Sequence, residues 1–305
     1  MASVEGTIGG NARKPGPVRR FVAFPLTLMV IDMVSVVAAA LLVARLGRML
    51  PAYSRNSPIR VLVAMAAALA VILVYKANKR WIERAPDREL AWSGALGELG
   101  TGLALGAGLF TVMTAAVGLM GGIVIEGVRG AGMIWAMLAM AIVSGVLEEV
   151  VFRGLIMRHL ESLIGTWGAL LLTSAFFGLA HILNPNATWF SSLAIMLEAG
   201  LLLGGAYLLT RRLWMAIGVH AAWNFTQGWV FSIPVSGSEP PIGLLKTHLL
   251  KTHMEGPEWL TGGAFGLEAS VCAMIVATVA GTILLMRARR NGAFLPPLWR
   301  RQTKE

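Results

Sequence analysis

The sequence predicts an all-α fold, a polytopic bundle of about eight transmembrane helices, and two observations lead to it. Hydrophobic residues make up 56% of the 305 residues and charged residues only 14%, so the chain is too apolar for a soluble globular domain. The apolar residues also gather in runs close to the ~20 residues that a helix needs to cross a bilayer. These runs lie at about 21–44, 61–75, 99–125, 132–152, 167–183, 190–209, 213–231 and 264–286.

The segments outside these runs are predicted to be tails and connections. Residues 1–20 are rich in Gly and Arg without an apolar period and are expected to be a disordered basic arm, and residues 291–305 a short basic tail. Between them, 21–290 would form one transmembrane domain. We expect an interfacial helix at 81–98 and an amphipathic helical turn around Leu244, Leu245, Leu249 and Leu250.

The net charge of +10 arises mainly from Lys and Arg residues beside the apolar runs. This distribution indicates membrane topology and no nucleic-acid partner, because short loops rich in Lys and Arg stay in the cytoplasm. We expect a multi-pass protein of the plasma (inner) membrane with both termini cytoplasmic and the lipid bilayer as a partner. The groups are Arg13, Lys14, Arg19 and Arg20; Lys76, Lys79, Arg80 and Arg84; Arg211 and Arg212; and Arg287, Arg289, Arg290, Arg300 and Arg301.

Glu148, Glu149 and Arg153 follow directly on about fifteen almost uniformly apolar residues. An ionisable group inside a membrane segment costs roughly 2.5 to 3.5 kcal/mol, so it faces the bundle interior or a wet cavity and marks a functional site. Glu149 and Arg153 are four residues apart and share one helix face. We therefore expect these two to pair, while Glu148 is turned by about 100° and left free for chemistry.

Two further apolar runs each carry a histidine, His181 and His220. If the helices on either side of Gly165 form a hairpin, Glu148 and His181 lie at the same depth, and His220 shares a helix face with Asn224. A carboxylate beside a histidine can deprotonate a water, and two opposed polar donors can stabilise the resulting oxyanion. This layout is typical of an acyl hydrolase that needs no nucleophile from the protein.

The three motifs E-E-x-x-x-R (148–153), F-x-x-x-H (177–181) and H-x-x-x-N (220–224) occur in this order on successive apolar segments. They resemble the CAAX protease and bacteriocin-processing family of intramembrane glutamic endopeptidases, also called the Abi family, which includes the Ras-converting CAAX endoprotease. The resemblance covers about 132–231, the expected catalytic core. It implies an endopeptidase that cleaves a CAAX-like or other peptide or membrane-protein substrate near the membrane.

The resemblance also implies residue roles. Glu148 and His181 would position and activate the water, and His220 and Asn224 would form the oxyanion site. Glu149, Arg153 and Phe177 would be supporting residues, with Phe177 packed against the ring of His181.

Other interpretations remain open at this point. No cofactor is expected, but a divalent metal such as zinc at Glu148, His181 and His220 is the alternative. The chain could instead be a non-catalytic bacteriocin-immunity or scaffold protein, or a transporter that uses the same buried acids. The sequence predicts no oligomeric state. The other acids in apolar runs, Asp32, Glu198 and Glu268, are expected to pair with polar groups, and His159, His248 and His253 to be loop or interface residues.

Overall fold

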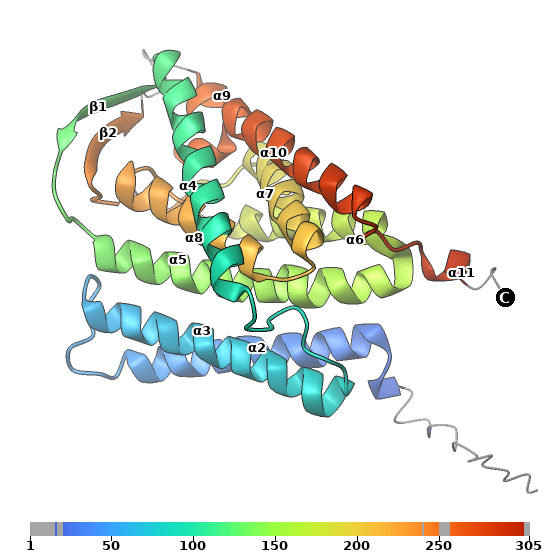
Figure 1. The fold of residues 1–305 in the computed structure, drawn as a ribbon. Coiled ribbons are helices and arrows are strands. Elements are labelled where there is room, and N and C mark those ends of the chain that lie inside the picture. Colours follow the sequence, from blue (N-terminus) through green and yellow to red (C-terminus); the bar gives the residue numbers. More distant parts are fainter. Residues whose placement is uncertain (1–15, 17–20, 240, 250–256, 302–305) are drawn as a thin grey trace, which may run out of the picture.

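The structure, a computed structural model, describes residues 16, 21–239, 241–249 and 257–301. These form a bundle of helices accompanied by one small two-stranded sheet (Figure 1). The predicted all-α polytopic membrane fold is confirmed. Most of the arm expected at 1–20, the end of the basic tail at 302–305 and His253 lie outside the described residues.

The long helices follow the apolar runs closely. Six helical stretches of the described chain are long and apolar enough to cross a membrane, and one of them, Ile134–Leu183, is 50 residues long. The helices are α2 (Pro25–Gly47), α3 (Pro58–Asn78), α4 (Ala95–Leu119), α5 (Ile134–Glu149), α6 (Arg158–Ala180), α7 (Trp189–Thr210), α8 (Trp214–Phe225) and α10 (Val271–Arg290).

Shorter helical segments continue or connect these. The π-helical segments η1 (Lys79–Glu83), η2 (Val150–Met157) and η4 (Thr226–Val230) extend α3, α5 and α8. The short helices η3 (His181–Leu183), α9 (Glu258–Thr261), η5 (Leu267–Ala269) and α11 (Leu298–Arg301) lie at loops and ends.

The 50-residue stretch makes two passes, because Gly165 breaks it within α6. Gly165 has φ of 75° and ψ of 172°, which are not helical angles. A Cβ there would also lie 2.7 Å from the backbone nitrogen of Pro297, since the C-terminal segment runs across this turn. The turn expected near Gly165 and Thr166 is therefore present, and η2 joins α5 to the first part of α6.

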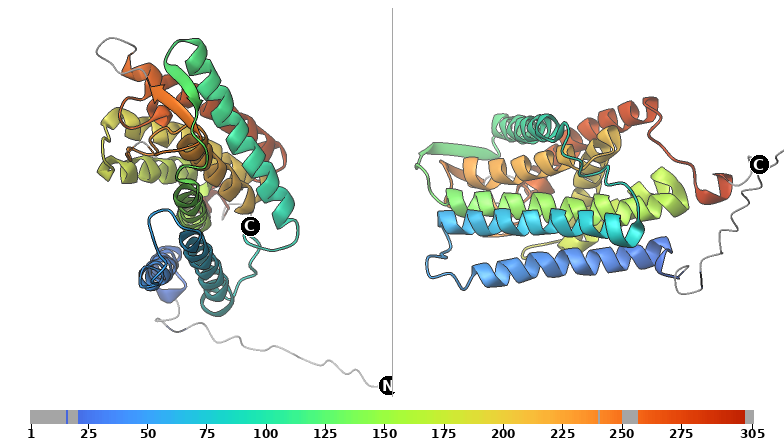
Figure 2. Two further views of the ribbon diagram at one scale, coloured as in Figure 1. Left: turned by 90° about the vertical axis from the view of Figure 1, so that its left-hand side faces the viewer. Right: turned by 60° about the horizontal axis from the view of Figure 1, so that its bottom comes forward.

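Helix α8 lies at the centre of the bundle, between α4 and α5 (Figure 1). Glycines permit the close approach on both sides. A Cβ at Gly106 of α4 would lie 2.3 Å from the carbonyl oxygen of Val219, and one at Gly145 of α5 would lie 2.9 Å from the Cβ of Ala221. Helices α2 and α3 form a pair that packs along α5 and α6, and the left view of Figure 2 shows this pair at one side.

Two predictions of local secondary structure are wrong. The segment expected to form a helical turn around Leu245 is strand β2 (Leu245–Leu249), which pairs antiparallel with β1 (Ile123–Val128). Its leucines have helical spacing, but its hydrogen-bonding partner lies far away in sequence. The interfacial helix expected at 81–98 ends at Glu83, because Arg84 adopts a left-handed conformation with φ of 55° and Pro86 follows.

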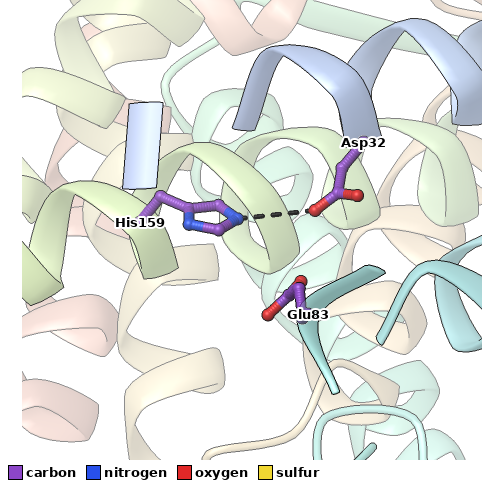
Figure 3. Close-up of side chains that lie close together, drawn as sticks. All are labelled: Asp32, Glu83 and His159. Carbon is purple, nitrogen blue, oxygen red and sulfur yellow. Dashed lines mark ion pairs between the residues drawn. The ribbon is translucent and has the colours of Figure 1, made fainter. Parts of the chain in front are cut away.

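A buried group of charged side chains joins α2, η1 and α6 (Figure 3). Arg158 donates from Nη1 and Nη2 to the two carboxylate oxygens of Glu83, at 2.7 and 2.6 Å. Nε2 of His159 lies 3.5 Å from Oδ2 of Asp32. The expectation that His159 is a loop or interface residue is wrong, because it lies in the regular first part of α6 and is only 4% exposed. Asp32 has polar neighbours, as expected.

Candidate active site

The two adjacent glutamates have different surroundings. Glu149 is completely buried, and its Oε1 accepts a hydrogen bond from Nη1 of Arg153 at 2.9 Å. The other end of the guanidinium donates from Nη2 to the carbonyl oxygen of Ala199 in α7, at 2.9 Å. Glu148, in contrast, retains 32% of its side-chain exposure. The structure thus has the expected division, with Glu149 in an ion pair and Glu148 outside it.

The helix changes form directly after this pair. Glu149 ends α5, and η2 begins at the next residue with wider π-helical turns. Such segments are rare and recur at functional sites. On the preceding turn, the absence of a side chain at Gly145 lets α5 approach α8. Both features place the glutamates against the face of α8 that carries His220.

His220 lies between the two carboxylates. Its Nδ1 is 2.9 Å from Oε1 of Glu149, and its Nε2 is 3.9 Å from Oε2 of Glu148. An ionised carboxylate only accepts hydrogen bonds, so with Glu149 ionised Nδ1 carries a proton and Nε2 faces Glu148. The contact between Glu149 and His220 was not predicted from the sequence. Glu149 therefore orients the histidine as well as neutralising Arg153.

His181 lies at the end of α6 and is held by its own helix. Its Nδ1 is 2.7 Å from the carbonyl oxygen of Phe177. Because a carbonyl only accepts, Nδ1 must be the protonated nitrogen, and in the neutral ring Nε2 is left as an acceptor. The rings of Phe177 and His181 have centroids 4.7 Å apart, and Arg153 lies 4.7 Å above the Phe177 ring. Phe177 thus contacts both the histidine and the buried ion pair.

Asn224 follows His220 by one helical turn. Its Nδ2 donates to Oγ of Ser144 on α5, at 3.0 Å. Ser144 was not identified from the sequence, although it is the polar residue one turn before Glu148 in an otherwise apolar run. The serine holds the amide group in place and leaves the second amide hydrogen for another acceptor.

A cavity of about 40 Å³ brings the predicted residues together. Phe177, His181, His220 and Asn224 line it, and Glu148 adjoins it through Nε2 of His220. Apolar side chains form most of the remaining wall. Glu198 and Glu268 line the cavity as well, although no catalytic role was expected for either from the sequence.

The residues proposed above as an alternative metal site do not form the tightest group of ligands. In the part of the chain that the structure describes, the potential ligand atoms that lie within 4.8 Å of one another belong to Asp32, Glu83 and His159. Nη2 of Arg158 lies 2.6 Å from Glu83, 2.9 Å from His159 and 3.8 Å from Asp32. A guanidinium already takes the position of a cation there, so we assign no metal to this cluster.

Residues 130–226 match the family model described as type II CAAX prenyl endopeptidase Rce1-like. Comparison with curated proteins and with solved structures finds no match. The matched region contains all three motifs, both histidines and both glutamates described above, and it lies within a bundle of candidate membrane helices. The resemblance inferred from the motifs is therefore confirmed over residues 130–226, where this integral membrane protein is similar to the type II CAAX prenyl endopeptidases.

Proposed function

We propose that the chain is an intramembrane glutamic endopeptidase that hydrolyses a peptide bond of a CAAX-like or other peptide or membrane-protein substrate. The observation that carries the proposal is the division of the two glutamates. Glu149 takes the hydrogen bonds of Arg153 and His220 on one oxygen. Glu148 is left partly exposed, 3.9 Å from His220 and beside the cavity.

In the proposed reaction, Glu148 and Nε2 of His181 hold a water molecule, and Glu148 accepts its proton as the oxygen adds to the peptide carbonyl. His220, from Nε2, and the free amide hydrogen of Asn224 donate to the oxyanion. For this role the His220 ring carries protons on both nitrogens, and its charge is balanced by the two glutamates. Glu148 then returns the proton to the leaving amine as the carbon–nitrogen bond breaks.

The charges at one end of the bundle support a site close to the cytoplasmic surface of the membrane. Arg158 pairs with Glu83, Arg211 with Glu161 and Arg212 with Glu98. By the positive-inside rule this end would face the cytoplasm. His220 is six residues from the start of α8 at Trp214, or ~9 Å along the helix. A substrate would therefore be cut close to the cytoplasmic surface, with the plasma (inner) membrane as the expected location.

The test is cleavage of a quenched fluorescent peptide library by the purified protein in detergent. We expect Glu148→Gln to lower turnover by about 10²- to 10⁴-fold, and the isosteric control Glu258→Gln, at an exposed position outside the cavity, to retain it. Turnover should persist with a strong chelator.

Three outcomes would change the proposal. Loss of turnover with chelator and recovery with zinc would reassign Glu148, His181 and His220 as metal ligands. Equal turnover of wild type and Glu148→Gln would remove Glu148 from the chemistry. An absence of turnover in the wild type across a broad library would favour the immunity, scaffold or transport function.

A further inference from the structure

Two buried acids of the cavity have no part in the proposed chemistry. Glu198 extends from α7 and is 3% exposed, and Glu268 extends from η5 and is 2% exposed. Both line the cavity that also contains His181, His220 and Asn224. They come from elements outside the three motifs, and Glu268 lies outside the region that matches the family model. They are therefore a feature of the folded chain that the motifs do not specify.

The protein leaves one of these acids partly without a partner. Oε2 of Glu198 is buried without a hydrogen bond, whereas Glu268 accepts one from the backbone N–H of Ser236 and also interacts with the side chains of Ser236 and Gln227. No Lys or Arg is among the described residues that line the cavity. The nearby Arg153 is committed to Glu149 and to the carbonyl oxygen of Ala199. Two carboxyl groups thus share a cavity in which the only cation among the described lining residues is the imidazolium of His220, whose charge Glu148 and Glu149 balance.

This arrangement selects the kind of ligand that can enter. Burial raises the pKa of Glu268 to about 7, although the hydrogen bonds from Ser236 and Gln227 and the nearby His220 act in the opposite direction. An acidic side chain would be repelled at these two groups, whereas a cation would restore the ionised form of the acids. A buried charge without a partner is costly, and a ligand that supplies the partner removes that cost.

The rest of the wall is apolar. Leu202 and Leu203 of α7, Trp223 of α8 and Ala277 of α10 line the cavity together with the two acids. Lysine and arginine side chains combine a long apolar stem with a charged head and pack their stems along such surfaces.

We propose that Glu198 and Glu268 form a specificity subsite that binds a lysine or arginine side chain of the substrate close to the scissile bond. The inference rests on the proposed peptidase function and names its substrate class, peptides with a basic residue at the cleavage site. The stem would contact Leu202, Leu203 and Trp223, and the charged head would lie between the two carboxylates.

Glu148→Gln is the parent protein for the test. Because this variant should bind peptides without cleaving them, binding is measured separately from cleavage. Three fluorescent peptide libraries are randomised in the same positions and differ at one central residue, which is lysine, norleucine or glutamate. We expect the lysine library to bind at least tenfold more tightly than the norleucine library, measured by anisotropy. Adding Glu198→Gln or Glu268→Gln should abolish this preference, and adding Glu258→Gln should preserve it.

Equal affinity of the parent protein for the lysine and norleucine libraries would overturn the inference, whether or not the glutamine variants fold. A lysine preference that persists in folded Glu198→Gln and Glu268→Gln would overturn it as well. Size-exclusion chromatography establishes that each variant is folded.

The two proposals can fail separately. If the parent binds the lysine library preferentially but the wild type cleaves no peptide, the subsite stands and the peptidase function fails. If the wild type cleaves lysine and norleucine peptides with equal kcat/KM and Glu148→Gln cleaves neither, the peptidase function stands and the subsite fails.

Discussion

Two buried clusters in this bundle contain the same residue types, two carboxylates, one arginine and one histidine, but differ in how the charges are paired. They are the site cluster (Glu148, Glu149, Arg153 and His220) and the end cluster (Asp32, Glu83, Arg158 and His159). In each cluster the arginine binds one acid closely and leaves the other with longer contacts.

The remaining acid has a different setting in each cluster. The side chain of Asp32 is only 1% exposed and faces His159 and Arg158, whereas that of Glu148 is 32% exposed beside a cavity. Residue composition alone therefore does not distinguish a structural cluster from a reactive one. The difference lies in whether the second carboxylate can be reached by a substrate.

The largest effect is expected from removing the arginine of the site cluster. Arg153→Met leaves the completely buried Glu149 without its main cation and should lower the free energy of unfolding by about 4 kcal/mol. Thermal unfolding in detergent measures the loss. The double variant Glu149→Gln/Arg153→Met should recover part of it, because no unpaired charge remains. A melting temperature that Arg153→Met leaves unchanged would contradict this account.

The matching change in the end cluster should be smaller and should spare activity. The Arg158 side chain is 16% exposed, so water offsets part of the loss, and Arg158→Met should cost about 2 kcal/mol of stability. Turnover per folded molecule should equal that of the wild type. A large loss of turnover in folded Arg158→Met would show that the end cluster also takes part in the chemistry.

The contact between helices that builds the site cluster can be weakened at Gly145. In Gly145→Ala the new methyl group would lie 2.9 Å from the Cβ of Ala221, and we expect a loss of about 1.5 kcal/mol in stability from overpacking. Turnover should also fall, because α5 and α8 separate and His220 moves from Glu149. The control is Gly108→Ala, whose added Cβ meets no atom within 4 Å and should leave turnover intact. Equal turnover in both variants would refute the argument.

The smallest expected effect is a pH dependence of ligand binding at the cavity acids. The pKa of Glu268 is raised to about 7, so this carboxyl is protonated below that pH and ionised above it. The affinity of lysine peptides for the Glu148→Gln protein should therefore increase several-fold from pH 6 to pH 8. Norleucine peptides should show no such increase.

Other titratable groups border the same cavity, namely Glu198 on α7, His220 on α8 and His181 at the end of α6. Protonation of the histidines at low pH would also weaken binding of a cation, so Glu268→Gln is the control that isolates Glu268. An unchanged pH dependence in that variant would assign the effect to the other groups.

Much of the fold and part of the site are predictable from local pattern. The apolar runs locate the long helices because crossing the membrane requires a length of apolar chain, and the longest stretch turns at Gly165 as expected. The pairing of Glu149 with Arg153 is predictable because both lie on one helix, four residues apart, so their relation depends only on helix geometry.

Contacts between segments were not predictable in this way. His220 hydrogen-bonds to Glu149 from another helix, β2 pairs with a strand far away in sequence, and His159 lies against Asp32. The long helices, the three motifs and the acid that stays outside the ion pair follow from the sequence alone. The contact of Glu149 with His220 and the shared cavity of Glu198 and Glu268 come from tertiary packing. They depend on the depth and rotation at which helices pack, and the periodicity within one helix does not specify these.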